Sequence, residues 1–239
     1  MALTGAILIA FVTGHLIGNL QVFSAPDKIN GYAHFLQSLG PTLWIVRLIL
    51  LASVIIHIWA ATVLTLENRA ARGTRYAVRH TIRATFSSLT MRWTGVVVLA
   101  FILYHLAHFS LGLAQADTFK TALPPYTMAA AYHVFGIPVV AAGAQVLDVH
   151  SMMILGFQNA IVSVFYIVAI GLLSLHLLHG VDSMFQTFGW RNARWSGALR
   201  KVAMLYCALY FIGNLAIPGA VLLGHLQPRA EVQAALAHR

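Results

Sequence analysis

Histidine is the residue type in this sequence whose placement suggests chemistry. Six of the twelve histidines fall within long apolar stretches: His15, His57, His105, His108, His176 and His179. A polar side chain at membrane depth is costly and usually faces a bundle interior or a functional cavity. Neutral imidazole is an effective axial ligand for haem iron, and two imidazoles on facing helices can clamp one haem. One such histidine alone could be a packing residue, but histidines on four separate apolar segments favour two haem sites.

Membrane depth predicts how these histidines pair, because two axial ligands of one iron must lie at similar depth. His15 lies eight residues before Phe23 and His105 lies nine before Ala114, where their apolar segments end on the outer side of the membrane. At 1.5 Å per residue, both are ~12–14 Å from that side. His57 lies thirteen residues after Trp44 and His176 lies eighteen after Gln158, at the outer ends of their apolar segments. These two histidines are therefore ~20–27 Å from the outer side. We therefore expect an outer pair, His15 with His105, and an inner pair, His57 with His176.

Two further histidines compete for these roles. His108 and His179 each lie three residues beyond a proposed ligand, on roughly the same face of a regular helix. Spacing alone does not choose between His105 and His108, or between His176 and His179. Whichever histidine is not a ligand could hydrogen-bond a haem propionate, a quinone or a backbone carbonyl.

The elements that position the histidines are predicted to be transmembrane helices. Hydrophobic residues make up 59% of the 239 residues, charged residues only 9%, and the mean hydropathy is +0.78. Five apolar segments, about 3–23, 43–66, 93–113, 152–178 and 202–224, approach or exceed the ~20 residues that cross a bilayer. We predict a single all-α domain, 1–239, that spans the cell (inner) membrane five times. Its one cysteine, Cys207, excludes an internal disulfide, a Cys-based iron–sulfur site and covalent c-type haem.

The net charge of +9 follows the membrane topology and does not indicate a nucleic-acid partner. Two loops carry most of the basic residues: Arg69, Arg72, Arg75, Arg79, Arg83 and Arg92 in one, and Arg191, Arg194, Arg200 and Lys201 in the other. Because cytoplasmic loops are enriched in Lys and Arg, both loops are predicted to be cytoplasmic. The N-terminus is then cytoplasmic and the C-terminus is outside.

The two outer loops are longer than simple connections require. Within 24–41, the stretch "NGYAHFLQSLG" predicts a short interfacial helix. Residues 114–150 contain Pro124, Pro125 and Pro138, and their apolar stretch is too short to span a membrane. Loops of this length often cover a functional site. Pro218 lies inside the fifth segment and is expected to kink it.

Acidic residues are nearly absent from the spans, since Asp182 and Glu67 lie near span ends. A proton relay or cation transporter normally has carboxylates at mid-depth. A haem-free transporter or structural anchor, whose histidines bind substrate or pack, is therefore the weaker alternative.

The motifs along the chain resemble those of a known family. They are "LTGAILIAFVTGHLIGNLQVF", "NGYAHFLQSLGP", "RLILLASVIIHIWAA", "MRWTGVVVLAFILYH", "GFQNAIVSVFYIVAIGLLSLHLLHGVDSMFQTFG" and "AIPGAVLLG". In this order they cover nearly the whole chain. The chain resembles the five-helix, dihaem cytochrome b subunit of succinate dehydrogenase and fumarate reductase.

This resemblance implies a membrane anchor of respiratory complex II. Such an anchor binds two b-type haems and a quinone, usually menaquinone, and pairs with a flavoprotein subunit and an iron–sulfur subunit. By position in the motifs, the implied ligands are His15, His57, His105 and His176. Family members commonly begin with a short cytoplasmic segment before the first span, and that segment is nearly absent from this sequence. The family also often has an aromatic residue at the position of His150, to which we assign no role. The alternative within electron transfer is the haem b subunit of a hydrogenase or formate dehydrogenase.

Five other residues are candidates for binding the quinone or the periphery of a haem. His34 lies in the first outer loop near Arg47, where polar groups could serve a quinone headgroup, although interfacial packing and anchoring is the favoured explanation for it. Arg92 could pair with an inner haem propionate, because guanidinium matches carboxylate geometry, or it is an ordinary flanking arginine. His108 and His179 complete this group.

Overall fold

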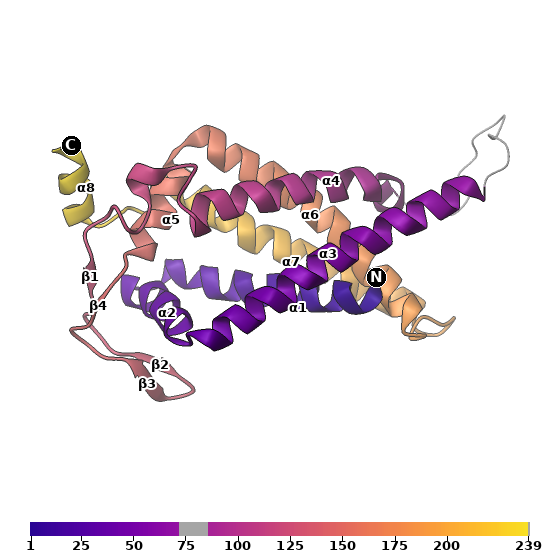
Figure 1. Cartoon of the computed structure of the whole chain (residues 1–239), viewed down its shortest axis with the longest axis horizontal. Helices are drawn as coiled ribbons and strands as arrows, with labels where there is room; N and C mark the ends of the chain where they lie inside the picture. The colour runs from indigo at the N-terminus through magenta and orange to yellow at the C-terminus, as the bar shows by residue number, and fades with distance from the viewer. Residues whose placement is uncertain (72–85, 239) are drawn as a thin grey trace.

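The computed structural model describes residues 1–71 and 86–238 and is built around five long helical segments (Figure 1). The first is α1 (Ala2–Asn19) with its 3₁₀ extension η1 (Leu20–Phe23). The others are α3 (Pro41–Ala70), α4 (Phe86–His105) with the π-helical turn η2 (Leu106–Ser110), α6 (Ala160–Thr187) and α7 (Ser196–Leu222). The protein is an all-α bundle of five helices that are long and apolar enough to cross a membrane, as predicted.

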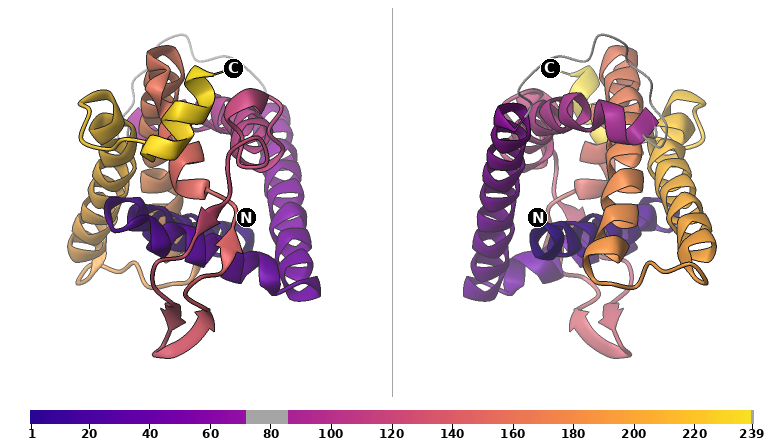
Figure 2. Two further views of the ribbon diagram at one scale, coloured as in Figure 1. Left: turned by 90° about the vertical axis from the view of Figure 1, so that its left-hand side faces the viewer. Right: turned by 90° about the vertical axis from the view of Figure 1, so that its right-hand side faces the viewer.

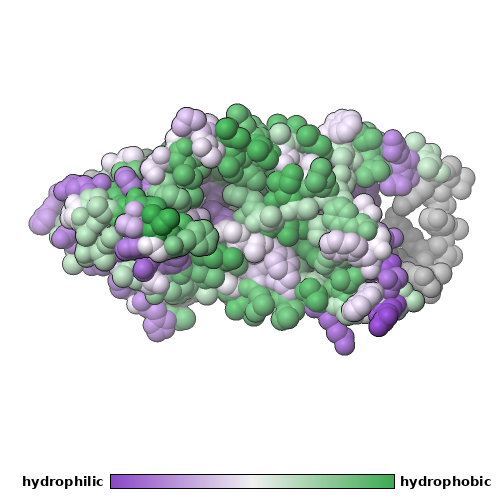
Figure 3. All heavy atoms as spheres, turned by 90° about the horizontal axis from the view of Figure 1, so that it is seen from below, coloured by the Kyte–Doolittle hydropathy of each residue, from purple (hydrophilic) through white to green (hydrophobic). Residues whose placement is uncertain are grey.

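The surface of the bundle fits a lipid environment. α3 has 30 residues, which corresponds to about 45 Å, and the apolar side chains along it are mostly exposed. An α-helix satisfies its own backbone hydrogen bonds, so such a surface is stable in hydrocarbon. Apolar atoms cover the middle of the molecule, and polar atoms gather at its two ends (Figure 3).

Several segment boundaries differ from the prediction, among them the end of α6 at Thr187 and the start of α7 at Ser196. The third helix begins at Phe86 and so starts seven residues before the predicted segment. The fourth apolar segment is two helices, because the chain breaks at Asn159 between α5 (Val149–Gln158) and α6. The side-chain oxygen of Asn159 accepts hydrogen bonds from the backbone N–H groups of Ile161 and Val162, and so caps the start of α6.

α6 is the centre of the bundle and packs against α1, α4 and α7. α3 packs against α1, and the end-on views place α3 and α7 on opposite sides of the molecule (Figure 2). The main apolar core includes Leu16, Phe101, Tyr166 and Cys207. Cys207 is therefore a buried packing residue.

One end of the molecule, which we call the basic end, contains the end of α3, the start of α4 and the turn from α6 to α7 (Figure 1). Asp182 forms ion pairs there with Arg191 at 3.1 Å and Arg200 at 3.7 Å. Four of the arginines predicted to make this end basic lie outside the described residues: Arg72, Arg75, Arg79 and Arg83.

The opposite end, which we call the cap, is built from the two long outer loops and the C-terminal segment. The first loop forms α2 (Pro26–Ser38), at the position predicted for a short helix. Residues 114–148 contain η3 (Ala116–Thr118) and four short strands, β1 (Tyr126–Thr127), β2 (Tyr132–Val134), β3 (Ile137–Val140) and β4 (Gln145–Val146). β1 pairs with β4 and β2 with β3, both antiparallel. The C-terminal helix α8 (Ala230–Ala237) completes the cap.

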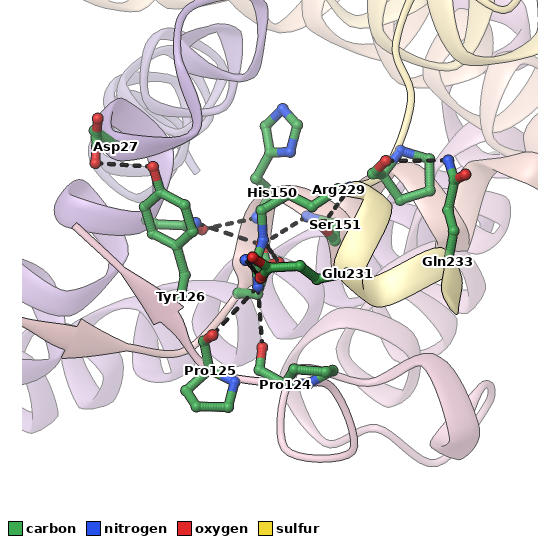
Figure 4. Close-up of polar contacts among 12 residues, drawn as sticks. Asp27, Pro124, Pro125, Tyr126, His150, Ser151, Arg229, Glu231 and Gln233 are labelled. Carbon is green, nitrogen blue, oxygen red and sulfur yellow. Dashed lines mark hydrogen bonds and ion pairs between the residues drawn. The ribbon is translucent and has the colours of Figure 1, made fainter. Parts of the chain in front are cut away.

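Arg229, just before α8, joins the parts of the cap (Figure 4). Its Nε atom donates to Asp148 at 2.6 Å, and its Nη2 atom donates to the carbonyl oxygens of Pro124 and Pro125. The Asp148 side chain is fully buried and also accepts hydrogen bonds from the Ser151 backbone and the Asn30 amide. A buried carboxylate needs such partners, so this cluster ties α2, α5 and the C-terminal segment together.

A second contact fastens the strands to α2. The Tyr126 hydroxyl donates to Asp27 at 2.9 Å (Figure 4), and the backbone N–H of Ala129 donates to the same oxygen at 2.8 Å. Burial and the Asp27 carboxylate raise the pKa of Tyr126 to about 12.

Candidate functional site

The structure brings the predicted outer pair together. His15 on α1 and His105 at the end of α4 have ring centres 5.7 Å apart, with their planes at 89°. His15 remains exposed although it lies inside a predicted span.

The inner pair also meets across two helices. His57 on α3 and His176 on α6 have ring centres 6.5 Å apart, with their planes at 58°. Both rings are only partly buried. The two pairs that membrane depth predicts are thus the two pairs whose rings lie close together in the structure.

These separations match the requirement of a metal held between two imidazoles. A metal–imidazole bond is about 2 Å long and the ring centre lies about 1 Å beyond the nitrogen, so opposed imidazoles have centres about 6 Å apart. Each ring can rotate about its metal–nitrogen axis, so either interplanar angle is compatible with this geometry. The two pairs lie at different depths. On α1, His15 is ten residues from Gly5, which lies beside His57 of the inner pair. On α4, His105 is eleven residues from Thr94, which contacts His176 of the inner pair. That spacing is ~15–17 Å along a helix.

The inner rings are held by threonine hydroxyl groups on neighbouring helices. Nδ1 of His57 lies 3.1 Å from Oγ1 of Thr4 on α1. Nδ1 of His176 lies 3.3 Å from Oγ1 of Thr94 on α4. Sequence reasoning assigned no role to either threonine, although both stand in the quoted motifs, each followed by glycine.

The outer rings have different partners. Nε2 of His15 is 3.1 Å from the Asn19 side-chain amide, one turn further along α1. Nδ1 of His105 is 3.4 Å from the Tyr166 hydroxyl on α6. The same hydroxyl lies 3.0 Å from Nδ1 of His108, so Tyr166 connects the two neighbouring histidines. Sequence reasoning missed both Asn19 and Tyr166.

His108 occupies a packing position and faces no other histidine. It is 3% exposed, it stacks on Phe109 with ring centres 3.9 Å apart, and its Nδ1 contacts Tyr166. A methyl group placed on Gly156 would lie 3.0 Å from its Nε2, so the chain at Gly156 packs close to that nitrogen. His108 lies in the π-helical turn Leu106–Ser110, which begins directly after His105. Both rings still contact the Tyr166 hydroxyl, as a shared face predicts, but among these two only His105 meets His15.

His179 lies apart from the inner pair, near the basic end. It lines a small recess with Ser87, Leu178, Asp182 and Arg200. Its partners are therefore polar groups at the end of the bundle, whereas His176, one turn earlier, meets His57.

The remaining predicted binding residues are not gathered into one site. His34 on α2 is exposed. Arg47 on α3 is exposed and lies over the Trp44 ring, 4.9 Å from its centre. Burial and the nearby Arg47 charge lower the pKa of Lys120, which places two cations close together at the cap. Arg92 is exposed and makes no hydrogen bond or ion pair with another described residue.

His150 differs from the other histidines because it is buried in the cap. It is 6% exposed, and its Nδ1 has no hydrogen-bond partner among the described residues. Its ring points away from the Arg229 cluster (Figure 4). Burial lowers the pKa of His150, opposed by the Asp148 carboxylate.

No protein-family model, no curated protein and no solved structure matches this chain. Within residues 1–71 and 86–238, no three or more His, Cys, Asp or Glu side chains are grouped so as to hold a metal ion. The candidate ligands come as pairs, and a pair of imidazoles is what a bis-histidine haem iron requires of its protein.

Proposed function

We propose that this chain is the dihaem b membrane anchor of a respiratory complex II. It would carry electrons between an iron–sulfur subunit and a membrane quinone during succinate oxidation or fumarate reduction. The chain is a five-helix membrane bundle, and two pairs of histidines face each other at two depths within it. The two ring-centre separations, 5.7 and 6.5 Å, carry the proposal because both fit an iron held between two imidazoles.

The residues present fit b-type haem. Iron in such a group needs only axial ligands from the protein, and neutral imidazole nitrogen provides them. Two bound haems would supply one-electron carriers at two levels of the membrane. His15 and His105 would hold the outer haem, and His57 and His176 the inner one, with no part for His108 or His179 as ligands.

The proposed partners follow from the two ends of the molecule and from the motif resemblance. The iron–sulfur and flavoprotein subunits would dock on the basic end, which the charge pattern predicts to be cytoplasmic. The quinone, in this form usually menaquinone, would bind near the membrane surface. His34 and Arg47 at the cap are the candidate contacts there, and Arg92 is the candidate partner for an inner haem propionate.

The arrangement argues against a haem-free transporter. Asp182, the acidic residue nearest the inner pair in the chain, is engaged by Arg191 and Arg200 at the basic end. A transporter's ionisable residues would line a path at mid-depth. Here the mid-depth polar groups are opposed imidazoles with threonine, tyrosine and asparagine partners.

The test is the absorption spectrum and subunit composition of the purified complex. We expect reduced-minus-oxidised b-type bands, two haems per chain, and co-purification of a subunit with covalently bound flavin. An assembled preparation without b-type bands would contradict the haem assignment. Two haems together with hydrogenase or formate dehydrogenase subunits would retain the haem assignment and refute complex II.

A further inference from the structure

Each imidazole of the inner pair rests on a threonine–glycine pair of a neighbouring helix. His57 lies against Thr4 and Gly5 of α1, and His176 lies against Thr94 and Gly95 of α4. Both threonines are buried, at 9% and 4% exposure. Two helices that are unrelated in the chain thus present the same dipeptide to the same kind of ring.

The glycine of each pair lies directly beside the ring. A methyl group on Gly5 would lie 3.7 Å from Cε1 of His57, and one on Gly95 would lie 3.5 Å from Cε1 of His176. These are ordinary van der Waals distances, so the ring packs against the helix at the glycine while the preceding threonine contacts its Nδ1.

The direction of each hydrogen bond follows from the inventory of the hydroxyl group. A threonine hydroxyl has one hydrogen and two acceptor lone pairs. Thr4 donates its hydrogen to the Met1 carbonyl oxygen at 2.9 Å, and Thr94 donates to the Met91 carbonyl oxygen at 3.0 Å. With the hydroxyl hydrogen on the carbonyl oxygen, each hydroxyl oxygen faces its imidazole as an acceptor.

An accepting oxygen requires hydrogen on Nδ1, and a neutral imidazole with hydrogen on Nδ1 has its lone pair on Nε2. We propose that Thr4 and Thr94 are positioning residues, which hold His57 and His176 with Nε2 bare and directed away from the supporting helix. This proposal rests on the proposed function for its purpose, a site ready to bind haem iron. The tautomer itself can be observed without any haem.

The chain contains its own control for this arrangement. Thr13 and Gly14 repeat the dipeptide on α1, and Thr13 also donates to a carbonyl oxygen, that of Ile9. Its hydroxyl contacts the Tyr206 hydroxyl at 2.8 Å, not a histidine. Replacing Thr13 removes a half-buried hydroxyl of the same kind and leaves the inner imidazoles alone.

The first experiment measures tautomers in the full-length, haem-free protein with ¹⁵N-labelled histidine. We expect hydrogen on Nδ1 at His57 and His176, and loss of that preference at His176 in Thr94→Val and at His57 in Thr4→Val. Thr94→Ser should retain it, and Thr13→Val should change neither ring. Hydrogen on Nε2 at both rings in the unmodified chain would overturn the proposal, whatever the function.

The second experiment measures haem binding and the potential of each haem. Partners of a ligand's other nitrogen typically contribute 10–100-fold to metal affinity. Thr94→Val should weaken the inner haem about ten-fold, leave the outer haem unchanged and raise the inner potential, because the ligand loses basicity. If the affinity for ferric haem falls ten-fold relative to that for ferrous haem, the one-electron potential rises by about 59 mV. Equal behaviour of Thr94→Val and Thr13→Val would overturn the proposal, and absence of haem from the unmodified protein would instead refute the proposed function.

Discussion

The inner and outer histidine pairs are similar in spacing but differ in which ring nitrogen is already engaged. The inner rings use Nδ1 to contact threonines, and within residues 1–71 and 86–238 no hydrogen bond is seen at their Nε2 atoms. In the outer pair, His105 uses Nδ1 but His15 has its Nε2 on the Asn19 amide. On the proposed haem assignment, haem at the outer site would replace the hydrogen bond between His15 and Asn19, whereas haem at the inner site would replace none of the described hydrogen bonds. The inner site would then be preformed, and the outer site would be completed by its ligand.

The two sites also differ in their surroundings. The outer pair lies within a group of aromatic rings that includes Phe101, Phe109 and Tyr166. Phe157 on α5 packs on both Phe109 and Tyr166, which connects this group to the cap. The inner pair lies between α3 and α6 near the basic end and has no such connection to the cap among the described contacts.

The largest expected effect comes from removing one ligand of each pair. His176→Ala should abolish the inner haem and keep the outer one, and His105→Ala should do the reverse, because the axial bond is lost outright. Haem content and resolved potentials of the purified variants measure this. His179→Ala is the matched control and should retain both haems. If His179→Ala lost a haem and His176→Ala lost none, His179 would replace His176 as the inner ligand.

A smaller effect is expected from breaking the cap, and it should reach only one pair. Arg229→Ala leaves the fully buried Asp148 carboxylate unpaired, which typically costs about 3–5 kcal/mol. Hydrogen exchange should rise in α5 and in the C-terminal segment. The outer haem should dissociate faster, through Phe157 and Tyr166, while the inner haem is unaffected.

Glu231→Ala serves as the control for that variant. Its carboxylate also pairs with Arg229 but is 77% exposed, so its loss should change stability by no more than about 0.5 kcal/mol. Equal loss of both haems in Arg229→Ala would show that the cap supports the whole bundle and not the outer site alone.

Acid pH should weaken the same end of the molecule through His150. Burial lowers its pKa, so protonation favours the unfolded chain, and the stability present above about pH 6.5 is lost as the pH falls. One proton contributes at most about 1.4 kcal/mol per pH unit. We expect His150→Phe to flatten the pH dependence of thermal unfolding between pH 6.5 and 5. Identical pH profiles for both proteins would show that the cap does not sense this proton.

The main features of the candidate site could be predicted from the sequence because they depend on position along a helix. Apolar length predicts the spans, and depth pairs His15 with His105 and His57 with His176. These quantities follow from a rise of 1.5 Å per residue and need no knowledge of how the helices rotate.

The partners of the rings could not be predicted, because they depend on helix rotation and on local irregularity. Thr4 reaches His57 across 53 positions of the chain, and Thr94 reaches His176 across 82. His108 lies in a π-helical turn, and such a turn has no pattern in the apolar sequence around it. The break at Asn159 and strands of two to four residues are hidden for the same reason.

The most direct test of the comparison is that removing a polar partner of a ring should have opposite effects at the two sites. Thr94→Val should weaken inner haem binding, whereas Asn19→Ala should strengthen outer haem binding by a smaller factor. Asn19→Ala removes the amide that occupies Nε2 of His15, so the outer site no longer exchanges a hydrogen bond when iron binds. A net hydrogen bond of about 0.5–1 kcal/mol predicts a two- to five-fold gain in outer haem affinity in equilibrium titrations. Asn214→Ala, which removes an amide bonded only to the Tyr210 carbonyl, should change nothing at either site. A loss of outer affinity in Asn19→Ala would mean that the amide supports the haem itself. The outer site would then be as preformed as the inner one, and the contrast between the pairs would disappear.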